Sequence, residues 1–269
     1  MITQKKTTCI LAALTLVTLG GLTHADVFTW ILNADDVWDN DLAWSGTPDQ
    51  FPVSGDDAIH DNVNIDQRIA VRRSGGETCA TFEGDGSDPG ERFLLIEDQI
   101  SLTVEDSIFS SGNDPFQIMF QDGNSTTSTG LIVGSGGMDN LSLEMSNEGG
   151  PWNGEYVLVD VEGAMDDSII TFPGDNNALN VGGNVTDSTI EFTGDDNVIE
   201  IDGDVTGTDV ELAGTGTTLD ALGDITSGTW ILAGSAVLTA DQTGTTVTGG
   251  DRSLDDTAEA HVQDVSGGT

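Results

Sequence analysis

The strongest constraint in this chain is a run of four consecutive 20-residue blocks that share one arrangement of residues. Each block opens with a glycine, and a second glycine follows nine residues later. The opening glycines are Gly154, Gly174, Gly194 and Gly214, and the second set is Gly163, Gly183, Gly203 and Gly223. A fixed period of this length marks a repeat architecture, so the blocks have to be interpreted together.

The same five positions are apolar in all four blocks. Positions six and eight flank a polar position, positions seventeen and nineteen form a second such pair, and position twelve stands alone. The columns are Val159/Leu179/Ile199/Leu219, Val161/Val181/Ile201/Ala221, Met165/Val185/Val205/Ile225, Ile170/Ile190/Val210/Trp230 and Phe172/Phe192/Leu212/Leu232. Apolar residues spaced by two predict half-buried strands. The glycines are expected to permit positive φ at corners between these strands.

A single block cannot bury its own apolar residues well enough to offset the entropy lost when its backbone is ordered. Stacked blocks can, with identical columns about 4.8 Å apart. The sequence therefore predicts an all-β fold, a single-stranded parallel β-helix (solenoid) with about 20 residues per coil. A degraded fifth coil is expected from Gly234 through Val237, Thr245 and Val247. The alternative is an antiparallel β-sandwich, which does not need column-for-column identity.

Residues 1–25 differ in character from the rest of the chain. Lys5 and Lys6 precede an apolar run from Cys9 to Gly21, and small residues stand around Ala25. This pattern predicts a secretory signal peptide, cleaved after Ala25 and too short for a membrane-spanning helix. The mature protein is expected to be secreted, extracellular or at the cell surface, without a transmembrane segment. Its one remaining cysteine, Cys79, is interpreted as a small core residue.

The composition is strongly acidic, with 47 Asp and Glu against 7 Lys and Arg and a formal net charge of −40. Residues 1–25 hold two lysines and no acidic residue, so their removal changes the charge to −42. Such a surface repels nucleic acid and anionic lipid, which excludes nucleic-acid partners. The expected partners are extracellular polysaccharide or other surface proteins. A solvated acidic coat is the simpler interpretation, and a specific site for an acid-binding partner is the alternative.

Residues 27–60 hold three of the five tryptophans. They stand in Phe28-Thr29-Trp30, Val37-Trp38-Asp39-Asn40 and Ala43-Trp44-Ser45-Gly46, followed by Pro52 and Gly55-Asp56-Asp57-Ala58-Ile59. This module resembles the opening of secreted bacterial β-helix surface proteins, of the autotransporter-passenger and planctomycete types. The resemblance covers these residues and the general coil pattern. It implies a secreted or cell-surface β-helix and says almost nothing about activity.

The tryptophans are interpreted as a cap, because a solenoid end exposes unpaired backbone and an open core. A platform of exposed tryptophans that binds sugars is the alternative. The predicted organisation is a signal peptide (1–25), a Trp-rich N-terminal cap (26–60), irregular coils with projecting loops (61–153), regular coils (154–250) and a polar C-terminal tail that has lost the columns (251–269). The irregular coils are expected to carry whatever specificity the protein has.

Catalytic residues are not predicted. The mature chain has no lysine to serve as the base of a β-helix lyase, and the abundance of Asp and Glu makes any pair of carboxylates uninformative. His60 and His261 have no neighbouring Ser or Cys pattern typical of a triad. We therefore expect a protein that is not an enzyme and binds no cofactor, with a polysaccharide lyase or hydrolase as the rival interpretation.

Stacked acidic residues at one corner of the repeat suggest a cation site. Asp175 is expected to stack against Asp195 and Asp196 of the next block, and carboxylate oxygens are ligands that Ca²⁺ accepts. These three residues are the predicted metal ligands and Ca²⁺ the candidate ion. The blocks lack the nonapeptide of calcium-roll proteins and the spacing of EF-hands.

The expected function is that of a secreted, non-enzymatic structural or adhesive β-solenoid at the cell surface or in the extracellular matrix. Two alternatives stay open at this point. One is a carbohydrate-binding or polysaccharide-degrading β-helix protein, and the other is a calcium-stabilised extracellular spacer.

Overall fold

The structure is a computed structural model. It describes residues 26–31, 36–40, 43–45, 50–60, 67–72, 76–85, 92–97, 99–121, 129–145 and 156–240, and the backbone of 247–248, 251–254, 259–262 and 265–266. The predicted signal peptide lies outside these residues.

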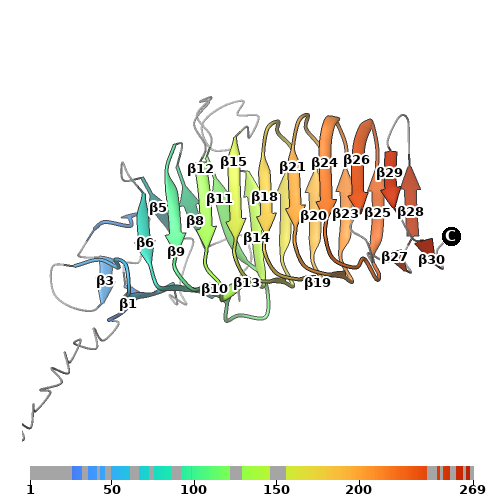
Figure 1. Cartoon of the computed structure of the whole chain (residues 1–269). Helices are drawn as coiled ribbons and strands as arrows, with labels where there is room; N and C mark the ends of the chain where they lie inside the picture. Colours follow the sequence, from blue (N-terminus) through green and yellow to red (C-terminus); the bar gives the residue numbers. More distant parts are fainter. Residues whose placement is uncertain are drawn as a thin grey trace, which may run out of the picture.

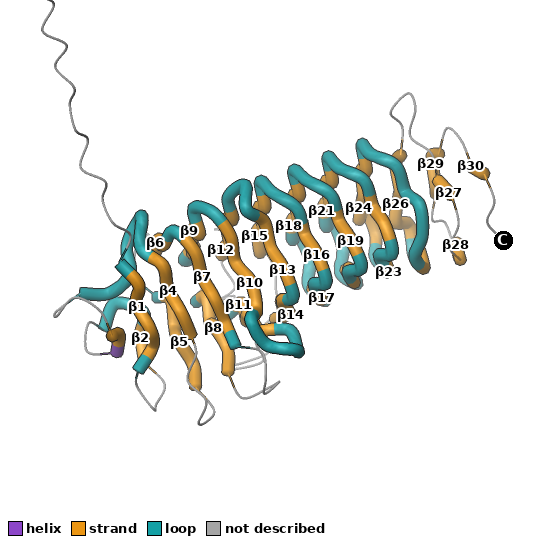
Figure 2. The backbone as a smooth tube through the Cα atoms, turned by 90° about the horizontal axis from the view of Figure 1, so that it is seen from below, coloured by secondary structure: helices purple, strands orange, loops and turns teal. Residues whose placement is uncertain are grey.

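The described chain is all-β and winds into a parallel solenoid with three faces (Figure 1). The predicted fold class is therefore confirmed, and the antiparallel sandwich is excluded because strands of successive coils pair in parallel. A typical coil contributes one strand to each of three sheets, here named A, B and C. The coils follow one another along a single axis, with their corners stacked in rows (Figure 2).

Sheet A consists of β3 (Trp44–Ser45), β1 (Val27–Trp30), β4 (Asp57–His60), β7 (Thr81–Gly84), β10 (Ser107–Ser110), β13 (Gly137–Asp139), β16 (Met165–Asp166), β19 (Val185–Thr186) and β22 (Val205–Thr206). Sheet B consists of β2 (Asp36–Val37), β5 (Gln67–Val71), β8 (Arg92–Ile96), β11 (Phe116–Phe120), β14 (Leu141–Met145), β17 (Ile169–Phe172), β20 (Thr189–Phe192), β23 (Asp209–Leu212), β25 (Thr229–Leu232) and β28 (Asp251–Leu254). Sheet C consists of β6 (Glu77–Cys79), β9 (Ser101–Val104), β12 (Thr129–Val133), β15 (Val157–Val161), β18 (Ala178–Val181), β21 (Val198–Ile201), β24 (Thr215–Ala221), β26 (Ser235–Ala240) and β29 (Glu259–Val262). A separate pair is formed by β27 (Val247–Thr248) and β30 (Val265–Ser266).

The five predicted columns are the buried interior of the regular coils. Ile190 pairs with Ile170 on one side and with Val210 on the other, so equivalent positions of successive blocks stack directly. All members of the five columns are at most 2% exposed. They belong to one continuous hydrophobic core, in which Phe172 and Phe192 pack edge to face with ring centroids 5.3 Å apart.

The earlier coils use the same architecture with longer and unequal lengths. Phe82 pairs with Ala58 of the preceding coil and with Ile108 of the following one. Ile108 in turn pairs with Met138, so each of these coils is longer than the coil before it. The extra residues lie between strands, where a loop can lengthen without disturbing the ladder. Unequal coils hide the period, which is why the repeat is visible only from Gly154 onward.

The two glycine columns have a different cause from the one expected. A Cβ at Gly194 would lie 2.1 Å from the carbonyl oxygen of Gly174, and one at Gly203 would lie 2.4 Å from that of Gly183. These glycines are needed because successive coils approach closely at these points. Among the described members of the two columns, only Gly214 has a positive φ, of 99°.

Positive φ values are concentrated instead at two stacked corners occupied mainly by Asn, Asp and Gly. The corner between sheets A and B has Asn140, Asp167, Asp187 and Gly207, with φ from 44° to 68°. The corner between sheets B and C has Tyr156, Asn176, Asp196 and Gly216, with φ from 55° to 80°. Asn and Asp adopt this conformation more readily than other residues with a side chain, so part of the acidic composition follows from corner geometry.

The N-terminal tryptophans are core residues. Trp30, Trp38 and Trp44 are at most 5% exposed, and Trp44 packs edge to face against both others with centroids 5.1 Å away. The Nε1 of Trp44 donates to the carbonyl of Trp38 at 2.8 Å. Strand β3 adds antiparallel to β1, the outermost parallel strand of sheet A. These rings fill an end of the core, so they do not form an exposed platform for sugars.

The C-terminal part of the chain differs from the predicted polar tail. Strand β28 pairs with β25, with Thr229 opposite Asp251. Strand β29 pairs with β26, with Val237 opposite Glu259. These coils are slightly longer than the regular ones, so the columns disappear from the sequence while the pairing persists. Of the expected fifth coil, Val237 lies in β26, which pairs with β24 with a register shift between Thr215 and Thr218. Val247 begins β27, and Thr245 lies outside the described residues.

We predict that Gly203→Ala destabilises the protein, because the new Cβ would lie 2.4 Å from backbone atoms of Gly183. Overpacking of this kind costs about 1–3 kcal/mol. The free energy of unfolding, measured by urea titration followed by circular dichroism, should fall by that amount. Asp202→Ala truncates an exposed side chain beside the same corner, and this side chain makes no hydrogen bond or ion pair with a described residue. It serves as the control and should change the free energy of unfolding by less than about 0.5 kcal/mol. Equal effects would contradict the close-approach explanation.

Candidate functional site

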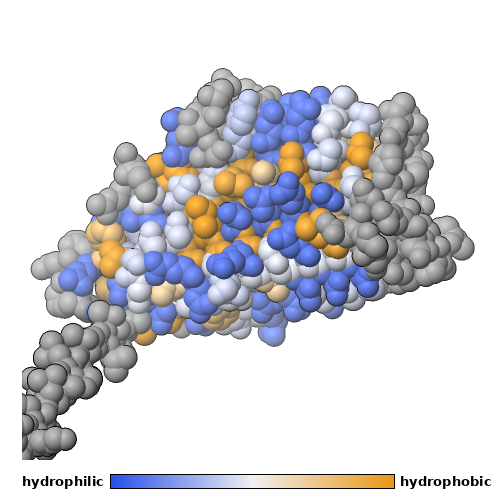
Figure 3. Space-filling model, in the orientation of Figure 1, coloured by the Kyte–Doolittle hydropathy of each residue, from blue (hydrophilic) through white to orange (hydrophobic). Residues whose placement is uncertain are grey.

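The outer face of sheet C carries a shallow groove of about 580 Å³. It crosses β9, β12, β15, β18 and β21 and the residues that follow them. Five carboxylates line it, those of Glu105, Asp160, Glu162, Glu200 and Asp202, and no basic or aromatic side chain does. Sheet C faces the viewer in Figures 1 and 3, and hydrophilic and hydrophobic residues are intermixed over this face.

One row of the groove alternates between carboxylates and glycines from coil to coil. Its members in order are Glu105, Gly134, Glu162, Gly182 and Asp202. The backbone amide of each donates to a carbonyl of the previous coil at 2.8–2.9 Å, which keeps the row in register. The glycines are required by packing, since a Cβ at Gly134 or Gly182 would lie 1.9 or 2.6 Å from the carbonyl oxygen beneath it.

The neighbouring row contributes the remaining two carboxylates. Asp160 of β15 pairs with Asn180 of β18, which pairs with Glu200 of β21. The two groove-lining carboxylates of this row are therefore also two coils apart, with an uncharged residue between them. Asp220 follows Glu200 on the next coil, outside the groove lining. Both rows place acidic groups on the coils of β15 and β21 and leave the coil of β18 without charge. Of the five carboxylates, only Glu105 lies in the irregular coils before Gly154, and the other four lie in the regular coils. The groove therefore does not match the expectation that specificity lies mainly before Gly154.

The side chains of these acidic residues have different bonding. Glu105 accepts hydrogen bonds from the hydroxyl of Ser54 and, at 3.0 Å, from the amide of Gly55. The carboxylates of the other four make no hydrogen bond or ion pair with any residue that the structure describes. They are therefore available to a partner in solution.

The predicted metal ligands do not form a cluster. The amide of Asp195 donates to Oδ1 of Asp175 at 2.6 Å, and the amide of Thr215 donates to Oδ1 of Asp195 at 2.6 Å. Asp196 occupies the left-handed corner position with φ of 55°. Two of the three side chains thus bind the backbone of the next coil, and calcium binding there stays a prediction.

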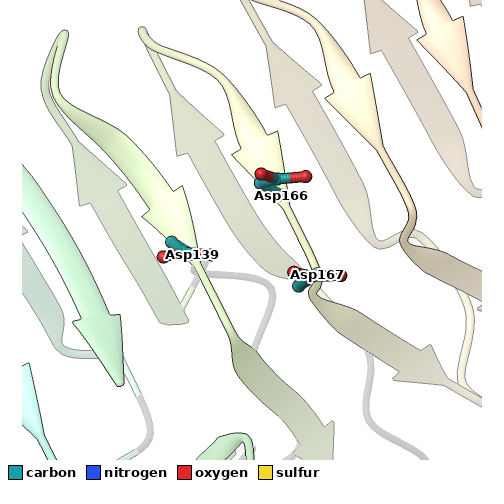
Figure 4. Close-up of side chains that lie close together, drawn as sticks. All are labelled: Asp139, Asp166 and Asp167. Carbon is teal, nitrogen blue, oxygen red and sulfur yellow. The ribbon is translucent and has the colours of Figure 1, made fainter. Parts of the chain in front are cut away.

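Another group of carboxylates comes together at a place that the repeat pattern does not predict. Oxygens of Asp139, Asp166 and Asp167 lie within 4.8 Å of one another at the corner between sheets A and B, and all three residues are exposed (Figure 4). Asp139 and Asp166 pair across a coil that is longer than the regular block, so the period does not reveal their contact. Partial burial raises the pKa of Asp139, and the charges of Asp166 and Asp167 raise it further. With one oxygen from each carboxylate, the group supplies three of the six to eight ligands that Ca²⁺ takes.

Cys79 and His60, the residue types that most often serve as nucleophile and general base, lie in the core. Cys79 is fully buried, as predicted, and burial raises the pKa of its thiol, with smaller contributions from Glu105, Asp57 and Asp56. His60 is fully buried and lies between Trp30 and Phe116, at centroid distances of 6.5 and 5.5 Å. Neither can reach a substrate bound at the surface.

No protein-family model, curated protein or solved structure matches this chain. The resemblance to secreted bacterial β-helix surface proteins therefore stays a prediction. Among the described residues, no helix has the length and apolar character needed to cross a membrane.

We predict that Asp195→Ala and Asp195→Asn differ in stability. Alanine removes the oxygen that accepts from the amide of Thr215, whereas asparagine keeps it. Alanine should lower the free energy of unfolding by about 1 kcal/mol, and asparagine by much less. Melts with and without chelator complete the test. If Asp195 is a calcium ligand instead, chelator should lower the melting temperature of the unmodified protein. It should lower the melting temperature of Asp195→Asn by less.

We also predict that Asp139→Asn stabilises the protein at neutral pH. The pKa of Asp139 is higher in the folded protein than in the unfolded chain. The free energy of unfolding therefore falls as pH rises from the unfolded pKa to the folded pKa, and above the folded pKa the loss is complete. The gain in melting temperature should be present at pH 7 and shrink towards pH 4, near the usual pKa of about 3.9. It should also shrink in 1 M salt, which screens exposed charges. A gain independent of both pH and salt would contradict this cause.

Proposed function

We propose that this protein is a secreted, non-enzymatic structural or adhesive β-solenoid that stands at the cell surface or in the extracellular matrix. The observation that carries the proposal is that polar side chains, buried and exposed, bond one coil to the next. The chain thereby builds a continuous rod whose outer faces stay open to partners.

One series of these bonds is buried at the corner between sheets B and C. Oδ1 of Asn177 accepts from the amide of Val157 at 2.9 Å, and Oδ1 of Asn197 accepts from the amide of Asn177 at 2.8 Å. Each asparagine also donates its Nδ2 to a glycine carbonyl of its own coil at 2.9 Å. Thr217 continues the series at the next coil. Buried amides that are satisfied in this way fix the register of the stack.

A second series is exposed at the corner between sheets C and A. The amide of Asp204 donates to Asn184 at 3.0 Å, and the amide of Asp224 donates to Asp204 at 2.8 Å. Asp175 and Asp195 form a similar series at another corner. Many acidic side chains are thus part of the scaffold. This use of polar residues supports a structural role, as does the burial of Cys79 and His60.

The groove on sheet C is where the carbohydrate alternative would place a sugar. Its lining offers carboxylates but no aromatic ring on which a sugar could stack. An adhesive surface for a charged partner fits this lining better than a site for a neutral polysaccharide. Release of reducing sugar from acidic polysaccharides by the purified protein would support the alternative.

We predict that the mature chain begins at Asp26 and is found outside the cytoplasm of the cells that produce it. N-terminal sequencing of the protein from the washed cell surface and from the medium provides the measurement. Deletion of the apolar run from Cys9 to Gly21 should retain the protein inside the cell. Recovery of the full-length chain from the cytoplasm, with Met1 intact, would overturn the proposed location.

A further inference from the structure

We propose that the groove on sheet C docks an extended cationic peptide in the polyproline II conformation, with Lys or Arg at every third residue. This inference names the partner of the adhesive surface and so rests on the proposed function for its biological meaning. The geometry that supports it belongs to the groove alone.

Negative charge in the groove is spaced regularly along the solenoid axis. Glu105, Glu162 and Asp202 occupy alternate coils of one row, separated by Gly134 and Gly182. Coils are about 4.8 Å apart, so successive carboxylates of the row are roughly 9.6 Å apart. Within the groove, Asp160 and Glu200 repeat this two-coil spacing in the adjacent row, and the next carboxylate of that row, Asp220, lies beyond the groove lining. The groove therefore presents negative charge with a period of two coils.

A polyproline II helix matches this period. It has three residues per turn and rises about 3.1 Å per residue, so every third side chain lies on one face at intervals of roughly 9.3 Å. An extended β-strand repeats its face at about 6.7 Å and therefore falls out of step with the carboxylates. A polyproline II peptide also has no internal hydrogen bonds and little conformational freedom to lose on binding.

Two carboxylates of the groove are available to a ligand. Glu162 and Asp202 are exposed, and neither makes a hydrogen bond or ion pair with a described residue. Asp175 and Asp195, by contrast, bind backbone amides of the next coil. A cationic ligand would therefore not have to displace internal partners at the two groups that the proposal uses.

An apolar row lies beside the charged rows on the outer face of sheet C. Leu158, Ala178 and Val198 are paired in register on β15, β18 and β21, and Val198 is 40% exposed. Ile132 of β12 is 38% exposed at the end of the adjacent row. The aliphatic stems of Lys and Arg bury against apolar surface while their charged ends remain at the carboxylates. Proline rings can pack on the same row.

Charge decides what kind of partner fits. The chain has a net charge of −40, so a second copy or any other anionic partner is repelled. Electrostatic complementarity selects a basic partner and excludes acidic ones.

The experiment uses purified residues 26–269 and two labelled peptides with the same composition. One contains four Lys-Pro-Pro units, and the other contains the same four lysines in an uninterrupted run. Fluorescence anisotropy at fixed ionic strength should show saturable binding of the Lys-Pro-Pro peptide, about tenfold tighter than that of the control peptide. Equal affinities would overturn the proposal, since they indicate only attraction to an acidic surface.

Two double variants locate the binding. Glu162→Gln with Asp202→Asn should weaken binding of the Lys-Pro-Pro peptide about tenfold. Glu191→Gln with Glu211→Gln removes the same charge from adjacent coils of sheet B and should leave affinity unchanged. Circular dichroism melts establish that each variant folds, and Asp160→Asn with Glu200→Gln replaces the first if it does not. Equal losses in groove and control variants would overturn the proposal.

The two hypotheses fail separately. The peptide assay uses purified protein, so its failure says nothing against secretion, and the location experiment does not depend on any peptide.

Discussion

The structure depends on one constraint, the stacking of successive coils at a fixed register through parallel backbone hydrogen bonds. Ile190 stays between Ile170 and Val210 only because the amides and carbonyls of β20 bond to both neighbouring strands. A slip by one residue would turn inward side chains to solvent. Glycines at close approaches and residues with positive φ at the corners are consequences of this requirement.

The acidic composition has two origins in the structure. Some carboxylates accept backbone amides of the adjacent coil, as Asp195 does for Thr215, and others occupy left-handed corners, as Asp196 does. The remaining ones, such as Glu162 and Asp202, have no such task among the described residues and face the groove. A formal net charge of −40 is therefore not simply a coat, because part of it holds the coils together.

Regular coils were predictable because a single offset relates their residues, so position in the block determined burial from Val159 to Leu232. Four of the groove carboxylates obey the same offset, since Asp160 and Glu200, like Glu162 and Asp202, stand two blocks apart. Glu105 was not predictable, because coils of other lengths bring it into the row of Glu162 and Asp202. The same applies to Asp139 beside Asp166, which a longer coil separates in the sequence. For strands β28 and β29, a small change in coil length was enough to hide the pairing.

The uniform offset of the regular coils also determines how the length of the protein can vary. Since every column between Gly154 and Leu232 repeats from one block to the next, one whole block can be gained or lost with each ladder rejoining in phase. The length of the rod can therefore change only in steps of one coil, about 4.8 Å each. The groove responds differently, because the gain or loss of a single coil breaks the alternation of its carboxylates and glycines. Growth by duplication would thus preserve the scaffold while rewriting its binding face.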